Sequence, residues 1–309
     1  MMRLSALYRK GTGVELSQEK AFELIQKAAS LDYAPAQAAL GISYLEGRGV
    51  EKDENLGYDW IRKAAENGHA LSRVMTGERL LSQADNEQSK QTGQEYIDSI
   101  LQNASPQELY TISYSFGHGL RLTKNPEKAR YWAKAAADKG SVNGTYYLGE
   151  LYWNAKEVPE ALKCFEKAAE LGSAMGLALL ADCIYKGRGT RTNRAEARRM
   201  WKEAADSGEI LSNIALGDDC AARGDNGRAL LYYRRARANA AHMPDIEYTP
   251  QVCLRVAQTE TRYTSRKKAL ALAAEARQGF SIKAREHEPD AEQWLAEADQ
   301  LIRELTSEL

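Results

Sequence analysis

The sequence is poor in the residues that build metal sites, disulfide frameworks and membrane spans. Its four cysteines lie 19, 37 and 33 residues apart, at Cys164, Cys183, Cys220 and Cys253. This spacing matches neither paired metal ligands nor a small disulfide-stapled scaffold, so we expect reduced, packed thiols and no metal site. The four histidines are scattered, and no stretch approaches the roughly 18 consecutive apolar residues of a membrane span.

The chain also lacks an excess of charge of either sign. Its 42 lysines and arginines against 43 acidic residues give a formal net charge of -1. A chain so balanced has no net field to attract nucleic acid or an anionic membrane, so we expect neither partner. The start, MMRLSALYRKGTG, has no signal-peptide pattern, which predicts a cytoplasmic protein as written. The first repeat begins partway through a helix, however, so a periplasmic or secreted protein with a trimmed N-terminus is the alternative.

What the sequence does contain is an internal repeat of about 35 residues. Residues 34–68 read APAQAALGISYLEGRGVEKDENLGYDWIRKAAENG, and residues 174–208 read AMGLALLADCIYKGRGTRTNRAEARRMWKEAADSG. The two copies share a leucine, two glycines, a tryptophan and an Ala-Ala pair. Further copies lie at 7–30, 114–140, 146–172 and 215–241, and the second of these begins with YSFGHGL at 114–120. Residues 70–104 keep the repeat spacing but lose most of the consensus residues.

Each copy is typical of two short amphipathic helices joined by a turn. The pairs Gly47/Gly49 and Gly187/Gly189 follow an expected helix with no preceding strand. We therefore interpret them as helix-ending turns rather than phosphate-binding loops. A single hairpin of this size cannot bury enough apolar surface alone, so neighbouring hairpins must share a core. The sequence thus predicts an all-α solenoid of stacked helix-turn-helix repeats.

The combined pattern LGISYLEGRGV followed by WIRKAAENG resembles the Sel-one-like repeat (SLR) family, a relative of the tetratricopeptide repeats (TPR). The resemblance implies a right-handed α-solenoid and an adaptor or scaffold function, often in bacterial envelope, secretion, exopolysaccharide or signalling systems. We expect a repeat domain over 1–240 and a C-terminal helical cap over 241–309. The expected repeats lie near 4–33, 34–69, 70–104, 105–140, 141–173, 174–208 and 209–240.

Beyond residue 241 the repeat fades and other helical patterns follow. The segment HMPDIEYTP at 242–250 predicts a loop, because it holds two prolines. A helix capped by Ser265 is expected to carry a stripe of Ala269, Ala273, Ala276 and Phe280. Asp290 with Gln293 resembles a capping box before a last helix with Trp294, Ala298, Leu301 and Leu305 on one face. We expect these helices to cap the solenoid, and docking or dimerisation through Trp294 and Leu301 is the alternative.

The sequence shows no recognisable catalytic motif. It contains no GxSxG elbow, HExxH helix, GxxxxGK[ST] loop or kinase-type signature. Carboxylates are abundant, but on amphipathic helices charges usually form a solvated face. We therefore expect a protein that is not an enzyme and needs no cofactor, with a hydrolase that uses dispersed carboxylates as the alternative.

Binding is better supported, because the TPR-like resemblance implies that the first helix of each hairpin lines a concave wall. When five first helices are aligned on Leu40, Thr76, Leu148, Leu180 and Leu216, the residues two positions later are Ile42, Glu78, Glu150, Asp182 and Asp218, of which four are acidic. Ile112 takes the corresponding place in the copy at 105–140 and interrupts the row. We expect a protein or peptide partner in this groove, and the acids favour a basic one. The predicted partner-binding residues are Glu78, Glu150, Trp153, Asn154, Asp182, Tyr185, Lys186 and Asp218.

A basic cluster at 186–202 offers a second surface. Its functional interpretation is an anionic partner, but acids such as Glu196 and Glu203 interrupt it, so we expect a solvated convex face. Taken together, the sequence predicts a non-catalytic protein-binding scaffold or adaptor. The alternatives are an inhibitor or immunity-type protein that occludes an enzyme, and an assembly factor for envelope, exopolysaccharide or secretion machinery. The sequence leaves the oligomeric state open.

Overall fold

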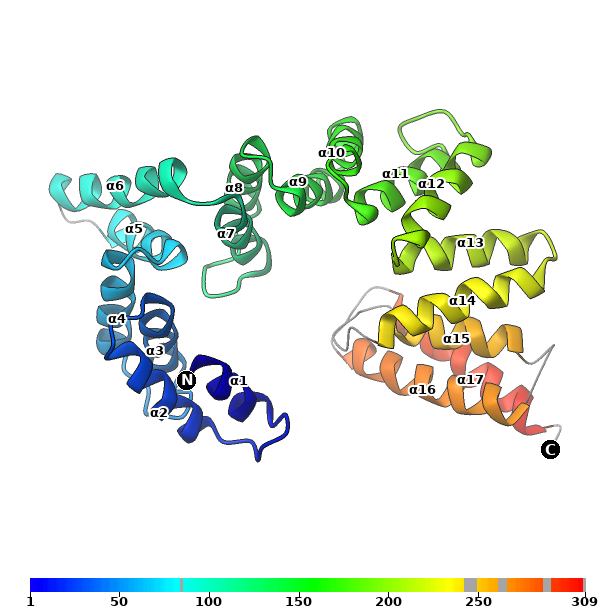
Figure 1. Cartoon of the computed structure of the whole chain (residues 1–309), viewed down its shortest axis with the longest axis horizontal. Helices are drawn as coiled ribbons and strands as arrows, with labels where there is room; N and C mark the ends of the chain where they lie inside the picture. The colour runs from blue at the N-terminus through cyan, green and yellow to red at the C-terminus, as the bar shows by residue number, and fades with distance from the viewer. Residues whose placement is uncertain (84–85, 242–248, 261–265, 286–289, 308–309) are drawn as a thin grey trace. The chain divides into compact units, whose positions relative to one another are not determined.

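The computed structural model describes residues 1–83, 86–241, 249–260, 266–285 and 290–307 (Figure 1). Every regular element in these ranges is an α-helix, which confirms the all-α prediction. The chain divides into two compact units, Met1–Ala155 and Lys156–Leu309. The predicted cap at Ser265 and most of the predicted loop, 242–248, lie outside the described residues. Thr249 and Pro250, the end of that predicted loop, instead open a helix, in which proline fits the first turn.

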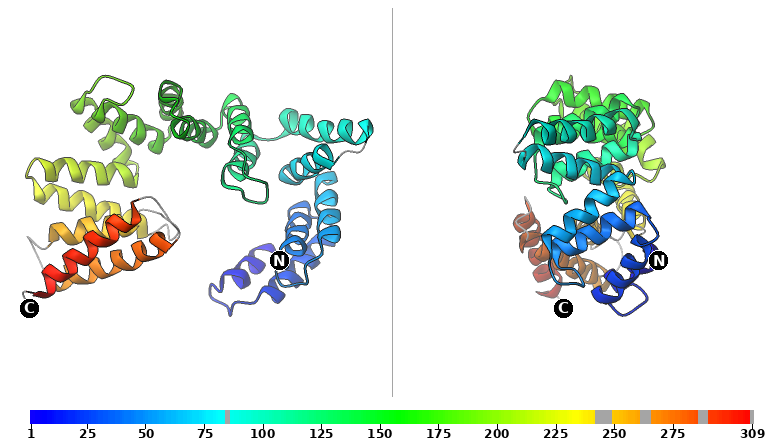
Figure 2. Two further views of the ribbon diagram at one scale, coloured as in Figure 1. Left: turned by 180° about the vertical axis from the view of Figure 1, so that it is seen from behind. Right: turned by 90° about the vertical axis from the view of Figure 1, so that its left-hand side faces the viewer.

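The first unit stacks helical hairpins in sequence order. Consecutive helices pack in pairs, and α5 also packs against α7 and α7 against α9 (Figure 2). The first helices α5, α7 and α9 therefore form a continuous layer in this unit. Its helices are α1 (Met2–Lys10), α2 (Gln18–Ala29), α3 (Ala34–Glu46), α4 (Glu54–Glu66), α5 (Ala70–Gln83), α6 (Glu87–Asn103), α7 (Pro106–His118), α8 (Pro126–Asp138) and α9 (Val142–Asn154).

The second unit continues the same pattern. Pairs α11–α12, α13–α14 and α15–α16 are hairpins, and α11 also packs against α13. Longer helices at its end, α16 and α17, pack on one another. Its helices are α10 (Val158–Glu170), α11 (Ala174–Lys186), α12 (Arg194–Asp206), α13 (Ile210–Ala222), α14 (Asn226–Ala241), α15 (Thr249–Glu260), α16 (Arg266–Arg285) and α17 (Ala291–Ser307).

Local chemistry fixes where these helices begin and end. The Asp53 carboxylate accepts a hydrogen bond from the Leu56 amide at 2.9 Å, and an asparagine does the same at the starts of α8 and α12. Gly47, Gly119 and Gly187 end α3, α7 and α11 with φ values of 68°, 70° and 69°. Glycine adopts this left-handed conformation without a Cβ clash. The interpretation of the repeated glycines as helix-ending turns is therefore confirmed.

Small residues let the two helices of a hairpin approach closely. A Cβ added at Gly41 of α3 would lie 2.7 Å from the Gly57 carbonyl oxygen of α4. In α7 the same position holds Ser113, whose hydroxyl donates a 2.7 Å hydrogen bond to the Ala129 carbonyl of α8. The repeated alanines of the second helices are buried as well, Ala64 completely. The small positions of the repeat are thus packing positions, as the sequence predicts.

The C-terminal helices share a core with the hairpin α13–α14. The predicted stripe on α16 is buried, with Phe280 1% exposed, and the Phe280 ring stacks on Trp294 of α17 at 6.0 Å between centroids. Leu301 and Leu305 join the same cluster as Ile210 of α13. The predicted faces of α16 and α17 are therefore confirmed, whereas a domain boundary at 240/241 and a capping role remain predictions.

Candidate functional site

The predicted partner-binding residues lie on first helices of both units. Glu78 is on α5, and Glu150, Trp153 and Asn154 are on α9, all in the first unit. Asp182, Tyr185 and Lys186 on α11 and Asp218 on α13 belong to the second unit. We describe each set within its own unit.

In α7, the residue that aligns with Glu78 and Glu150 differs from the one predicted from the sequence. The Gly119 amide donates to the Ser115 carbonyl in the way that the Gly47 amide donates to Ser43, so Gly119 and not Gly117 ends the helix. The residue aligned with Glu78 and Glu150 is consequently Tyr114, which is 38% exposed, and not Ile112, which is fully buried. The prediction that Ile112 interrupts the row is therefore wrong, because the sequence GHG suggested the turn two residues too early.

The acidic side chains of the row are paired within the chain. Glu78 of α5 forms an ion pair with Lys128 of α8. In the second unit, Asp182 lies 2.6 Å from the ammonium of Lys186, one turn later on α11. Lys186 therefore neutralises a carboxylate of the row that it was predicted to join. These pairs are partly exposed, so each contributes little to stability.

Asp218 of α13 joins three further helices of the second unit. Its carboxylate accepts a 2.6 Å hydrogen bond from the Tyr233 hydroxyl of α14 and lies 3.2 Å from Nε of Arg255 of α15. The Arg255 guanidinium also covers the ring of Trp294 of α17 at 5.1 Å. Asp218 thus acts as a structural link between hairpins, and its charge is balanced locally.

Tyr185 contacts an acid that the sequence analysis missed, Asp219. The Tyr185 hydroxyl donates to Asp219 at 2.9 Å, and the guanidinium of Arg198 donates to both carboxylate oxygens at 2.8 Å. Arg223 adds an ion pair at 2.7 Å, and the Asp219 side chain is only 3% exposed. Burial alone would raise the pKa of Asp219, but the bonds and charges of these partners outweigh it and lower the pKa. Arg198, from the basic cluster that we predicted to be solvated, therefore pairs with a buried carboxylate while its own side chain stays 35% exposed.

Glu150 and Asn154 come together beside a group of aromatic rings in the first unit. They line a pocket of about 560 Å³ with His118 and Tyr147. The Tyr114 ring stacks on the His118 ring at 3.9 Å, and the Tyr147 hydroxyl lies 3.3 Å from His118 Nδ1. Burial, followed by the charge of Glu150, raises the pKa of Tyr147, so its phenol stays neutral. Trp153 is half-buried on the same helix, α9.

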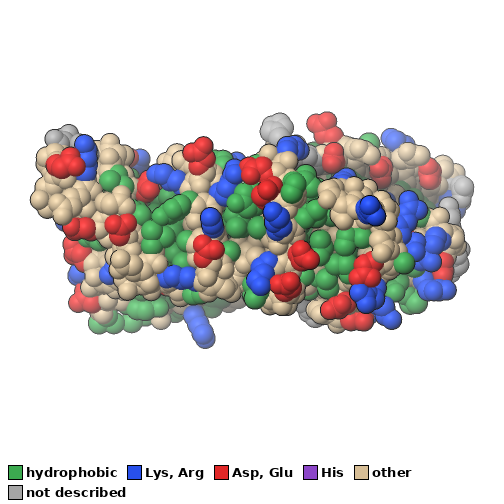
Figure 3. Space-filling model, turned by 90° about the horizontal axis from the view of Figure 1, so that it is seen from above, with side chains coloured by type: hydrophobic (Ala, Val, Ile, Leu, Met, Phe, Trp, Pro, Cys, Tyr) green, Lys and Arg blue, Asp and Glu red, His purple; other side chains and the backbone are tan. Residues whose placement is uncertain are grey.

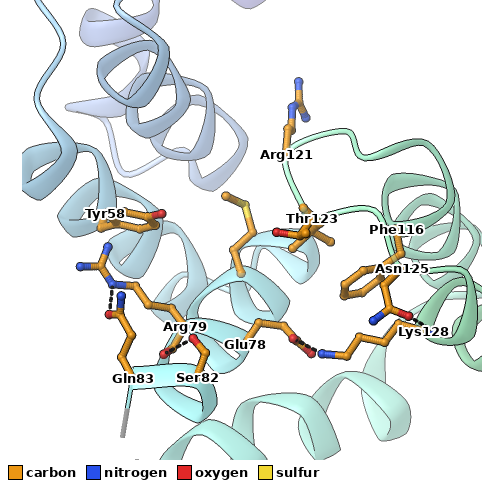
Figure 4. A pocket seen from close by; sticks show the side chains of 12 residues that line it. Tyr58, Glu78, Arg79, Ser82, Gln83, Phe116, Arg121, Thr123, Asn125 and Lys128 are labelled. Atoms are coloured by element: carbon orange, nitrogen blue, oxygen red, sulfur yellow. Dashed lines mark hydrogen bonds and ion pairs between the residues drawn. The ribbon is translucent and has the colours of Figure 1, made fainter.

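A second pocket of the first unit, of about 300 Å³, adjoins Glu78 (Figure 4). Glu78 and Lys128 point toward one another from α5 and α8, and Arg79 lies under the Tyr58 ring at 3.5 Å from its centroid. Arg79 Nε also donates to the Gln83 side chain at 3.1 Å. Arg121, from the loop between α7 and α8, also lines the pocket, but its side chain points away from Glu78 and Arg79.

The described ranges offer little to metal or thiol chemistry. No group of three or more His, Cys, Asp or Glu side chains in them could hold a metal ion. Burial raises the pKa of the buried Cys183 to about 11, which keeps its thiol protonated and unreactive. Acidic and basic side chains are interspersed on the face shown in Figure 3. In the part of the chain that the structure describes, no helix combines the length and apolar character needed to cross a membrane.

Comparison with known proteins identifies the repeat. The family model described as Sel1 repeat matches residues 1–33, 34–69, 110–141, 143–173 and 174–209. The hairpins α5–α6 and α13–α14 share the fold although the family model does not match them. For α5–α6 this agrees with the weak consensus of residues 70–104.

Two curated relatives match 122 residues of the chain. The uncharacterized protein NMB1327 of Neisseria meningitidis serogroup B is 27% identical over 38% of this chain and 26% of the relative. The Sel1-repeat-containing protein YjcO of Escherichia coli K12 is 24% identical over 36% of this chain and 53% of the relative. The chain therefore spans about a quarter of the first relative and about half of the second.

The solved structure of c5321, a protective antigen of uropathogenic Escherichia coli that displays an SLR fold, is also similar. It is 20% identical, covers 99% of this chain and 75% of its own, and gives a TM-score of 0.48. A score this low carries no argument about function. The family model, in contrast, matches more than half of the residues. The resemblance found in the sequence is thus confirmed, and the chain belongs to the Sel1 repeat family.

Proposed function

We propose that this protein is a non-catalytic scaffold that holds a protein or peptide partner on its first helices and the loops that follow them. One observation carries the proposal. In the first unit, the position shared by Glu78, Tyr114 and Glu150 recurs on three successive first helices as a side chain only partly removed from solvent. Both pockets described above lie along this row. A rigid row of such side chains costs a partner less ordering entropy than a flexible surface would.

The predicted preference for a basic partner finds less support. Glu78, Asp182 and Asp218 are each paired with a lysine or arginine of the same chain. A carboxylate that is already paired attracts a further cation weakly, because the local field is nearly neutral. Reversing the charge of Asp218 would also set two cations against each other beside Arg255, so that variant tests stability more than binding. The exposed aromatic ring of Tyr114 is a better probe of the row.

The test compares two tyrosines of one hairpin. The full chain is used as bait, captured proteins are identified by mass spectrometry, and their affinity for the purified chain is measured. Tyr114→Ala on the first helix α7 should weaken binding, because aromatic side chains commonly dominate interfaces. Tyr131→Ala on the second helix α8 is the matched control, since Tyr131 is 52% exposed. It should leave the affinity unchanged.

The outcome distinguishes the proposal from its alternatives. Equal binding by both variants would contradict a binding face on the first helices. A tight one-to-one complex with an enzyme that loses its activity would instead favour the inhibitor or immunity-type function. Turnover of a substrate by the purified chain, lost when one acid is replaced, would contradict the non-catalytic assignment.

A further inference from the structure

We propose that His69 is a pH-sensitive cap that releases the start of α5 in acid. His69 directly precedes α5, in the turn that follows α4. Helix α5 carries Glu78 of the row described above and packs on α4, α6 and α7 of the first unit (Figure 1). The effect on partner binding rests on the proposed function, whereas the cap itself concerns only the folded chain.

The cap consists of two contacts at one nitrogen of the imidazole ring. The Ser72 amide donates a hydrogen bond to His69 Nδ1 at 3.3 Å, and the Ser72 hydroxyl oxygen lies 2.8 Å from the same nitrogen. A backbone N–H can only donate, so Nδ1 must present its lone pair, and the proton of the neutral ring lies on Nε2. The ring thereby satisfies an amide of the first turn that has no partner within the helix.

Protonation of the ring removes this acceptor. In the imidazolium both nitrogens are donors, so the Ser72 amide loses its partner. The Ser72 hydroxyl can reverse its role and accept from Nδ1, but the amide cannot. Ser72 is fully buried, so water does not replace the lost bond while the turn stays closed. The helix dipole adds to the cost, because a positive charge at the N-terminus of a helix is unfavourable.

The surroundings of His69 favour the neutral ring. Burial is the main reason that the pKa of His69 lies below its ordinary value of 6.5. The charge of Arg121, from the loop between α7 and α8, lowers this pKa further, and the charge of Glu108 on α7 acts in the opposite direction. Among the described residues of α4 and α6, no charged side chain contributes to this balance. The folded chain therefore keeps the capped, neutral form near neutral pH.

Other first helices have a cap that does not titrate near neutral pH. Ser141 and Ser173 accept the amide three residues later, at the starts of α9 and α11. Both serines, like His69, directly follow a glycine with a left-handed φ. Histidine is the side chain whose ordinary pKa lies between pH 5 and 8. The first turn of α5 therefore has a titratable cap at a position where other hairpins have serine.

Acid should accordingly favour the open first turn of α5. Because the pKa of His69 is lower in the folded chain, its neutral ring contributes full stability above pH 6.5. This contribution decreases as the pH falls from 6.5 toward the folded pKa, since the open turn takes up the proton first. The first turn places Ala70 and Leu71 in a core shared with Leu109 of α7. Opening it loosens the contact between two helices that carry the row.

The experiment measures amide hydrogen exchange of the full chain by mass spectrometry at about pH 7.5 and about pH 5.5. Each rate is divided by the intrinsic rate at that pH, so that only the opening of the helix is compared. In the wild type, opening of the start of α5 should increase about five- to tenfold in acid, because protonation of the open form adds up to about tenfold per pH unit below the ordinary pKa. The serine-capped starts of α9 and α11 should change less than about twofold.

The decisive variant is His69→Ser. It gives α5 the cap that α9 and α11 have, so the chain should fold, and opening of α5 should change less than about twofold between the two pH values. His69→Asn also keeps a cap without titrating and should behave in the same way. His118→Gln is the matched control, because it removes the other histidine of the first unit, and it should keep the wild-type dependence at α5. Nitrogen NMR of the wild-type imidazole should place the proton of the neutral ring on Nε2.

Three results would overturn the inference: equal opening of α5 at the two pH values, the same pH dependence in His69→Ser as in the wild type, or a proton on Nδ1 of the neutral ring. The measurement needs no partner, so its failure leaves the Tyr114 test of the scaffold function intact. Conversely, a partner that binds independently of Tyr114 would refute the proposed face without affecting hydrogen exchange at α5.

Discussion

The network around Asp219 gives the sharpest test of how the second unit is held together. The substitution Asp219→Asn keeps the volume of the side chain but removes its charge. The aspartate accepts two hydrogen bonds from Arg198 and one from Tyr185, and it forms an ion pair with Arg223. Tyr185 lies on α11, Arg198 on α12 and Arg223 directly after α13, so the carboxylate joins two successive hairpins.

The expected loss is about 2 kcal/mol of unfolding free energy. Removing one member of a buried ion pair costs about 3–5 kcal/mol when the remaining charges stay buried. Here the side chains of Arg198 and Arg223 are 35% and 51% exposed, so water restores part of their solvation. The asparagine oxygen also remains an acceptor for Tyr185. For a unit of this size, a loss of about 2 kcal/mol lowers Tm by about 4–8 °C.

The assay is urea unfolding followed by tryptophan fluorescence, to which Trp201 contributes with its ring 4.8 Å from that of Tyr185. The control is Glu196→Gln, which breaks an exposed pair with Arg199 on α12 and should cost less than about 0.5 kcal/mol. If Asp219→Asn were as stable as the control, the network would contribute nothing and the reasoning would be refuted.

The difference in stability between the wild type and Asp219→Asn should also depend on pH. The pKa of Asp219 is lower in the folded chain than its ordinary value of 3.8. Its carboxylate therefore stabilises the folded state fully above that value, and the contribution is lost as pH falls through the folded pKa. The stability difference between the wild type and Asp219→Asn should be constant at neutral pH and should narrow below pH 3.8. A difference that persisted in strong acid would show that charge is not its cause.

Three further predictions concern packing and the thiols. In urea unfolding, Gly41→Ala should destabilise the chain by about 1–3 kcal/mol, because its Cβ would lie 2.7 Å from a carbonyl oxygen of α4. The control Gly227→Ala, whose Cβ would have its nearest neighbour at 3.9 Å, should be neutral or stabilising by up to about 1 kcal/mol. Ile112→Ala should cost about 2–5 kcal/mol and Tyr114→Ala about 1 kcal/mol, and the reverse order would contradict the register assigned to α7. Iodoacetamide should label Cys183 slowly at pH 8 in the folded chain and quickly in urea, because burial raises its pKa to about 11, and equal rates would show that the thiol is accessible.

Much of the fold follows from short-range features of the sequence. The glycines at 47 and 187 end helices because their left-handed φ disfavours other residues, and side chains such as Asp53 cap the helices that follow. The spacing of the alanines in α16 predicts its buried face directly. The register of α7 failed because GHG contains two glycines, and only the backbone hydrogen bond from Gly119 shows which one ends the helix.

The candidate sites could be predicted only in part, because their chemistry depends on distant partners. A row of acids on the first helices is visible in the sequence, but the lysine that neutralises Glu78 is 50 residues away. Tyr185 was identified as a binding residue, whereas its hydroxyl bonds to an acid 34 residues later.

The repeat, the all-helical hairpins and their buried faces follow from local sequence, since helix periodicity, capping and left-handed glycines act over a few residues. Which charges neutralise one another depends on how the hairpins stack. Electrostatic pairing depends on distance in space, and stacking the hairpins brings Lys128 to Glu78 and Arg198 to Asp219.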